Sequence, residues 1–174
     1  YERVKKIAEA ASMMANVDYD MELISGIYEI LPNRFGAGII QNNFELLGEI
    51  KYTDSEINYA NTILKETGKE LKGLDGTIKP LRPTLPATGG STDVGDVSQV
   101  VPVVRLRTTT AAKDGPWHSW AVVACTGMSI GHKGMIYASK ALAMTMLDLY
   151  KNPKLIDGVK KEFLVRKGDK VYVP

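Results

Sequence analysis

The chain has 174 residues, of which 44% are hydrophobic and 24% are charged, and its 22 basic and 20 acidic side chains leave a formal net charge of +2. This is the composition of an ordinary globular protein that is long enough to bury a core. So small a net charge gives no electrostatic argument for nucleic acid or a membrane surface as a partner, and we expect neither. No apolar run reaches the roughly 18 residues of a membrane-spanning helix, and no signal peptide is visible.

The chain has a single cysteine, Cys125, within the apolar run AVVACTG. One cysteine excludes an intramolecular disulfide and a zinc-finger spacing. We expect its side chain to be a small buried apolar group, because free cysteine is most often interior. A lone reduced cysteine favours a reducing compartment, and we expect a cytoplasmic protein.

The first thirty residues predict a helix followed by a strand. Apolar side chains recur at three- and four-residue spacing over 2–15, which indicates an amphipathic helix. The alternation of Tyr19, Met21 and Leu23 predicts a strand within 18–30. The turn-forming residues LPN (31–33) follow, and we place there a boundary between this helix-strand unit and the main body of the chain.

Two further helices are predicted before a long irregular stretch. The first covers 35–47. The second begins at Thr53, which forms a capping box with Glu56, and it ends at Gly68. Residues 71–90 are rich in proline and glycine and cannot form one regular element, and a loop of this length is typical of functional or mobile segments.

The second half of the sequence predicts strands and then helices. QVVPVVRLR (99–107) and HSWAVVACT (118–126) are apolar enough for strands covered on both faces, although Pro102 removes one ladder donor. A long helix is predicted over 129–150. Asn152-Pro153 breaks it, a last helix runs to about residue 166, and the tail is a candidate strand. This alternation favours an α/β layer fold, with a sheet flanked by helices.

Two histidines are the clearest candidates for chemistry. His118 stands in GPWHSW, where a neutral imidazole could bind zinc while its other nitrogen is held by an acceptor. His132 stands in SIGHKGM at a predicted helix start, which favours an anion. The alternatives are a hydrogen-bonded structural histidine at 118 and a capping or packing histidine at 132.

The stretch TGGSTDVGDVS (88–98) contains almost no large side chains. Asp93 or Asp96 could orient a ligand, and Gly89, Gly90 and Gly95 would let backbone N–H groups approach it closely. Glycine and aspartate are equally the usual residues of plain turns, so the spacing alone leaves both interpretations open.

Two tryptophans, Trp117 and Trp120, flank His118. They could wall a pocket for an aromatic group or simply bury apolar area. The chain has no nucleophile elbow for a serine hydrolase, no dinucleotide-binding glycine motif and no phosphate-binding loop of the G-x-x-x-x-G-K-[ST] type.

Taken in order, the motifs resemble one enzyme family. STDVGDVS, the run VVPVV, PWHSW and SIGHKGM before a helix rich in small residues resemble the carboxy-terminal part of the dinuclear-zinc amidohydrolases and metallopeptidases, in their aminobenzoyl-glutamate branch. This family also holds carboxypeptidase G and the hydrolases of indoleacetyl-amino acids. At the amino end, RVKKIAEAASMM and YEILPNR resemble the end of the inserted lid, or dimerisation, domain. The resemblance implies that 1–32 is a remnant of that domain and that 33–174 is the carboxy-terminal portion of the catalytic domain.

The resemblance also implies roles for particular residues. His118 matches the family's final metal-binding histidine, and Asn33 matches the asparagine where the lid strand ends. The loop that borders the active site matches Ser91, Thr92 and Asp93. Two residues typical of the aminobenzoyl-glutamate branch match Asp96 and His132, and we expect all five of these loop and branch residues to bind substrate.

What cannot be matched is equally informative. The family's other metal ligands and its glutamate base lie upstream of the lid domain, and no residue of this chain matches them. The resemblance therefore implies the last third of an enzyme that uses two zinc ions to hydrolyse the amide bond of an N-acyl amino acid, such as p-aminobenzoyl-glutamate, or a dipeptide-like substrate. We expect this chain alone to be inactive, to bind zinc weakly or not at all, and to form a homo-oligomer. The alternative is a non-catalytic ligand-binding or dimerisation module derived from the family.

Overall fold

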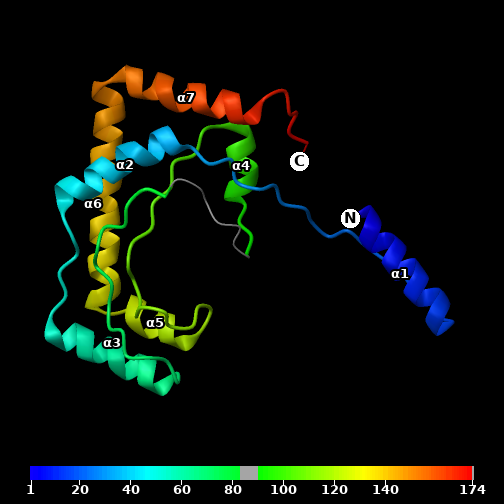
Figure 1. Ribbon diagram of the computed structural model, residues 1–174, viewed down its shortest axis with the longest axis horizontal. Helices are drawn as coiled ribbons and strands as arrows, with labels where there is room; N and C mark the ends of the chain where they lie inside the picture. The colour runs from blue at the N-terminus through cyan, green and yellow to red at the C-terminus, as the bar shows by residue number, and fades with distance from the viewer. Residues whose placement is uncertain (83–89, 174) are drawn as a thin grey trace.

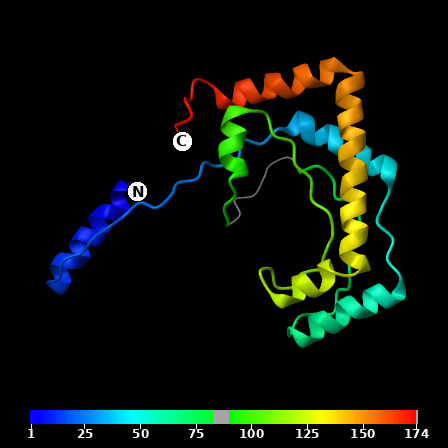
Figure 2. The same cartoon turned by 180° about the vertical axis from the view of Figure 1, so that it is seen from behind.

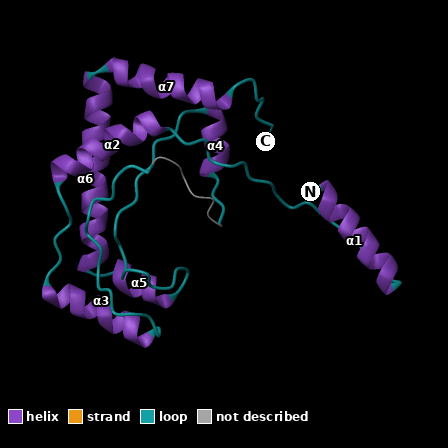
Figure 3. Cartoon of the chain, in the orientation of Figure 1, coloured by secondary structure: helices purple, strands orange, loops and turns teal. Residues whose placement is uncertain are grey.

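The computed structural model describes residues 1–82 and 90–173 of the chain. Within these residues all regular structure is helical, and no strand is present (Figure 3). The helices in chain order are α1 (Glu2–Ala15), α2 (Arg34–Leu47), α3 (Asp54–Glu66), α4 (Val94–Val100), α5 (Trp120–Thr126), α6 (Ser129–Lys151) and α7 (Pro153–Lys167).

The prediction of an α/β fold with a sheet flanked by helices is therefore wrong for the described residues. Of the predicted strand 99–107, residues 99 and 100 belong to helix α4 and the rest pairs with no strand; residues 18–30 and the described tail up to 173 form no strand either. An extended segment becomes a strand only when a neighbour fills its backbone hydrogen bonds. Within the run 118–126, residues 120–126 instead form helix α5, because a short apolar run fits a buried helix as well as a strand.

The long predicted helices are confirmed almost to the residue. The capping box at the start of α3 is present, since the Thr53 hydroxyl accepts from the Glu56 N–H and the Glu56 carboxylate accepts from the Thr53 N–H. At the start of α2, the side chain of Asn33 accepts from Gly36 N at 2.8 Å and donates to Val159 O on α7 at 2.8 Å. Asn33, which the sequence matched to the end of a lid strand, is thus a buried helix cap that also ties α2 to α7.

Helix α6 forms the axis on which the other packed helices are arranged (Figure 1). It contacts α2, α5 and α7, and α2 also contacts α7. Between α2 and α6, the ring of Tyr137 stacks on Phe44 with centroids 5.5 Å apart, and its hydroxyl donates to Gly48 O at 2.7 Å. The buried Asn43 side chain donates to Thr145 and Asp148 on α6. Polar contacts of this kind fix the register of the two helices as well as their separation.

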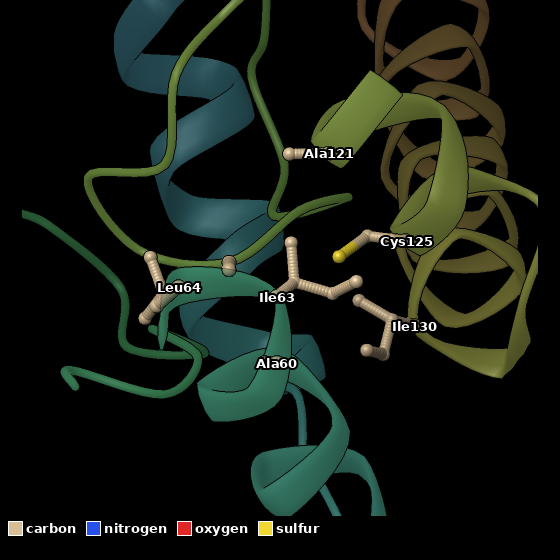
Figure 4. Close-up of a cluster of buried hydrophobic side chains, with 7 residues drawn as sticks. Ala60, Ile63, Leu64, Ala121, Cys125 and Ile130 are labelled. Atoms are coloured by element: carbon tan, nitrogen blue, oxygen red, sulfur yellow. The ribbon is translucent and has the colours of Figure 1, made fainter. Parts of the chain in front are cut away.

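A small hydrophobic core joins α3, α5 and the first turn of α6 (Figure 4). Its fully buried members include Leu64 of α3, Cys125 of α5 and Ile130 of α6. Cys125 is thus the buried small apolar side chain that the sequence predicted. Because α5 is only two turns long, its position depends on this core.

Helix α1 lies apart from the other helices in both views of the chain (Figures 1 and 2). None of its residues is buried, and the extended segment 17–29 that follows is exposed along its length. The proposed boundary between 1–32 and 33–174 remains a prediction. No helix within the described residues is long and apolar enough to cross a bilayer.

The extended segment 101–110 runs along the helices at close range. The Thr108 hydroxyl donates to Gly134 O on α6 at 3.2 Å, and a Cβ at Gly134 would overlap the carbonyl oxygen of Thr109. Gly134, from the motif HKGM, is therefore needed so that the backbone of this segment can approach α6.

We predict that Gly134→Ala destabilises the protein by about 1–3 kcal/mol, because the new methyl group overlaps backbone that cannot easily retreat. The matched control is Gly38→Ala in α2, where a Cβ meets open space and should raise the unfolding free energy by up to about 1 kcal/mol. Chemical denaturation of both variants measures the difference. Equal effects of the two substitutions would contradict the close approach of 108–110 to α6.

Candidate functional site

The turn before α5 presents His118 in an unusual backbone conformation. The φ angle of His118 is +56°, in the left-handed region that side chains other than glycine seldom adopt. The turn is closed by the Ser119 hydroxyl, which donates to Pro116 O at 2.6 Å. Earlier in this loop, Gly115 N donates to Ala112 O at 3.2 Å, and Ala112 belongs to the core. The strained residue is therefore held from both sides by ordered backbone.

The side chain of His118 is exposed and makes no hydrogen bond within the described part of the chain. The structural interpretation, a histidine satisfied by hydrogen bonds, has no support in these contacts. The conformation is also not required by packing, because the residue is not part of the core. Such a residue is free to take a ligand.

We predict that His118→Gly leaves the unfolding free energy unchanged or raises it by up to about 1 kcal/mol, because glycine adopts positive φ without steric cost. His118→Val should lower it by about 1 kcal/mol or more, since a β-branched residue fits this conformation worst. Thermal unfolding of both variants checks the order. A valine variant more stable than the glycine variant would contradict the left-handed conformation.

Both tryptophans next to His118 are exposed to solvent. Trp117 is 71% exposed and Trp120 is 56% exposed. Trp120 begins α5, whose inner face is formed by Ala121 and Cys125 in the core. The two indoles therefore are not part of the core that the described residues form.

The residues Ser91, Thr92 and Asp93 lead into helix α4. Residues 88 and 89 of the same stretch, Gly89 included, lie outside the described residues. Gly95 in the first turn of α4 is buried, and a Cβ there would overlap the carbonyl oxygen of Tyr28. Its small size thus serves the packing of α4 against the segment 28–31, where Ser98 and Gln99 also hydrogen-bond the backbone. Ser91 and Asp93 are exposed.

Asp96 faces the carboxy-terminal tail. Its carboxylate accepts from the hydroxyl of Tyr172 at 3.2 Å, and the Tyr172 ring lies against Tyr28 with centroids 5.2 Å apart. Asp96, Val97, Val100, Val101 and Tyr172 line a shallow cavity of about 350 Å³. The contact places Asp96 in the attachment of the tail to α4.

His132 lies in a different place, in the first turn of α6. It lines an open cleft of about 460 Å³ between α6 and the segment that joins α2 to α3. The cleft wall includes the lysines at positions 51, 133 and 140 and the apolar side chains of Ile50 and Ile136. Glu49 also lines the cleft and pairs with Lys51, so the lining carries three lysines and one glutamate. The anion role of His132 stays a prediction.

A buried carboxylate ties this end of α6 to α3. Glu56 is 8% exposed and accepts from Lys133 Nζ at 2.6 Å, from the Ser129 hydroxyl at 2.6 Å and from Thr53 N at 2.7 Å. Burial raises the pKa of the Glu56 carboxyl, but the hydrogen bonds from Lys133, Ser129 and Thr53 outweigh it and lower the pKa to about 2. The charged form of Glu56 is therefore the form that stabilises the fold.

We predict that Glu56→Gln lowers the unfolding free energy at neutral pH by about 1–3 kcal/mol, because Lys133 loses its charged partner. Since the pKa of Glu56 is about 2 when folded and near 4.5 when unfolded, its contribution is present above pH 4.5 and is lost as the pH falls toward 2. Urea unfolding at several pH values should show the variant and the parent converging in acid. Glu66→Gln, at the exposed end of the same helix, is the control and should change little. This role of Glu56 would be contradicted if the difference in unfolding free energy between Glu56→Gln and the parent did not narrow in acid.

The predicted site residues thus fall into three places. His118 lies in the turn before α5, the residues at 91, 92, 93 and 96 lie on or just before α4, and His132 lies on the first turn of α6. No hydrogen bond or ion pair joins these three places within the described ranges. The pairing of Glu56 with Lys133 was not predicted, because the capping box signals only the local contact of Glu56.

The described residues do not by themselves complete a metal centre. No group of three or more His, Cys, Asp or Glu side chains that could hold a metal ion occurs among them. A zinc ion in a protein usually takes at least three protein ligands. Within the described residues, no such set of ligands is therefore gathered around His118.

Comparison with known proteins supports the family resemblance of the motifs. The chain is 28% identical over 187 aligned residues to one of the subunits of the p-aminobenzoyl-glutamate hydrolase of Escherichia coli (strain K12). The chain is similar to a p-aminobenzoyl-glutamate hydrolase subunit. The match covers 93% of this chain but 39% of the E. coli protein, so the chain spans well under half of that relative's length. No family model matches the chain, and no solved structure matches it.

This similarity confirms the resemblance that the motifs predicted. It agrees with a hydrolase origin of the sequence, and the aminobenzoyl-glutamate branch is the one that the E. coli protein's name specifies. The comparison names neither a metal nor metal-binding residues.

Proposed function

We propose that this chain is the carboxy-terminal part of a zinc-dependent amidohydrolase of carboxypeptidase type that cleaves the amide bond of an N-acyl amino acid such as p-aminobenzoyl-glutamate. The observation that carries the proposal is the match of 93% of the chain to the E. coli p-aminobenzoyl-glutamate hydrolase subunit. The exposed, unpaired imidazole of His118 supports it, because a metal ligand must be available to the ion.

In this proposal His118 supplies one of the ligands of a zinc ion, whose part in the reaction is to activate water and polarise the amide carbonyl. The general base and the remaining ligands belong to sequence that is not in this chain. The hydrogen bond from the Ser119 hydroxyl to Pro116 O supports the role of His118, because it closes the turn that carries this residue. Ser91, Thr92, Asp93 and Asp96 on the α4 side, and His132 in the cationic cleft, would contact the substrate.

The carboxylates of an N-acyl glutamate match the cationic cleft at the start of α6. Lys51 and Lys133 both line it, although each already pairs with a glutamate, at 2.9 Å and 2.6 Å respectively. The side chains of Lys140 and His132 line the same cleft and make no hydrogen bond or ion pair within the described ranges. These two side chains are the ones that would take an additional anion.

A second candidate is a module that forms dimers without catalysis. The observation that favours it is α1, an amphipathic helix without a buried residue, whose Ile7 and Met14 are 59% and 89% exposed. Exposed apolar stripes of this kind are typical of surfaces that a partner covers. We expect self-association through α1 whether the chain belongs to a hydrolase or to a non-catalytic module. Only a measurement of catalytic activity therefore distinguishes the two candidates.

We predict that His118→Ala in the complete enzyme lowers kcat/KM for p-aminobenzoyl-glutamate by at least about 100-fold and lowers the zinc content, because one metal ligand is lost. His132→Ala is the matched histidine control and should raise KM with the zinc content unchanged. Metal analysis and steady-state kinetics measure both. A His118→Ala enzyme with full zinc content and activity would refute the proposed role, and hydrolysis by the isolated chain would refute its inactivity.

A further inference from the structure

Helix α6 is apolar on the face that it buries and also on the face that it exposes. The buried face holds Ile130, Gly134, Ala141 and Thr145. The exposed face holds six large apolar side chains, each 44% or more exposed, which we call the outer α6 face: Met135, Ile136, Leu142, Met146, Leu147 and Tyr150. Intervals of four, seven and eleven residues place these side chains along one side of the helix.

The outer α6 face carries no charge. Ser139 and Ala143 fill the positions between its large side chains. Asp148, the acidic residue of this helix, accepts a hydrogen bond from Asn43 on α2 at 2.8 Å. A surface helix presents polar side chains to water, whereas a helix that is apolar all round is normally covered on all sides. The outer α6 face therefore lacks its cover among the described residues.

The chain as a whole exposes more surface than a self-contained protein of its size. Its accessible surface is 12452 Å². A folded monomer of 19.1 kDa exposes about 8400 Å², so the excess is about 4000 Å². Helix α1 and the exposed segment 17–29 account for part of this excess, and the outer α6 face adds to it on the packed helices.

We propose that the outer α6 face is the surface on which the preceding part of the same polypeptide docks in the complete enzyme. The inference rests on the proposed function, which makes this chain the carboxy-terminal part of a longer enzyme. It goes beyond that function, because it assigns to α6 an interface that neither the motifs nor the comparison assign.

The size of the uncovered surface favours preceding chain over a second copy as the occupant. A standard protein–protein interface covers about 800 Å² of each partner, and a large obligate dimer covers roughly 1000–2500 Å². Either value falls short of the excess of about 4000 Å². The match to the E. coli relative covers 39% of that protein, so more than half of its length has no counterpart in this chain. A segment of that length is long enough to cover the remainder.

The chemistry of the face favours a permanent contact. Contacts that never open are more apolar than contacts between partners that also exist separately, and they resemble a domain core cut in two. The outer α6 face has this character, since methionine, isoleucine, leucine and tyrosine are its large residues. A contact within one polypeptide is permanent, and unbranched methionines such as Met135 and Met146 adapt their shape to fill gaps in it.

Methionine oxidation in the complete enzyme tests the proposal. With hydrogen peroxide and peptide mass spectrometry, Met135 and Met146 should be oxidised at least about 10-fold more slowly than an added N-acetyl-methionine amide, because preceding chain covers them. Oxidation at a rate close to that of the added standard would overturn the proposal. Protection that is lost when the enzyme is diluted would also overturn it, because a second copy would then be the cover.

A pair of substitutions in the complete enzyme gives an independent measurement. Met146→Glu should lower the midpoint of thermal unfolding by about 5 °C or more, because it places an unpaired carboxylate in a covered interface. The matched control is Val165→Glu, at an apolar residue that is 75% exposed beside the charged residues Glu162 and Arg166 of α7, and it should change the midpoint by at most about 2 °C. Equal midpoints for the two variants would contradict the proposal.

These measurements separate the inference from the proposed function, because neither depends on catalysis. Slow oxidation of Met135 and Met146 in a complete protein that does not hydrolyse p-aminobenzoyl-glutamate would support the docking surface and refute the activity. Rapid oxidation of both methionines in an active enzyme would refute the docking surface and leave the activity standing.

Discussion

The contact between the Glu56 carboxylate and Lys133 is the interaction on which the position of the candidate site depends. It is made at 2.6 Å by a side chain that is 8% exposed, and it fixes the start of α3 against the start of α6. Helix α3 then supplies Ile63 and Leu64 to the core that holds α5. The turn with His118 leads directly into α5, so the imidazole is placed by a chain of contacts that begins at a buried charge.

The parts of this arrangement that sequence could predict are those set by local chemistry. The capping box of Thr53 and Glu56, the glycine after α2 and the asparagine-proline break after α6 each act within a few residues, and the helices that they bound were predicted correctly. The predicted strands at 99–107 and 118–126, like the one within 18–30, do not form, and the first two failed for different reasons. Residues 118–126 are too short for periodicity to separate helix from strand, and 101–107 is extended but has no neighbouring strand within the described residues.

In the candidate site, too, the sequence reveals local features but not those that depend on long-range packing. His118 could be singled out from PWHSW, but its left-handed backbone and the exposure of both indoles depend on how α5 packs, which sequence does not reveal. Gly95 was interpreted as a glycine that lets a ligand approach, whereas it lets α4 approach the backbone of Tyr28. The partners of Asp96 and Lys133 lie 76 and 77 residues away along the chain, beyond the reach of any local pattern.

The proposed function requires zinc to bind at the imidazole between the two tryptophans. Crystals of the zinc-loaded complete enzyme, measured at the zinc absorption edge, would locate the metal directly. We predict an anomalous peak about 2.0–2.1 Å from a ring nitrogen of His118, the usual length of a zinc–histidine bond. Zinc peaks held entirely by other residues, with the His118 ring bound to no metal, would contradict it.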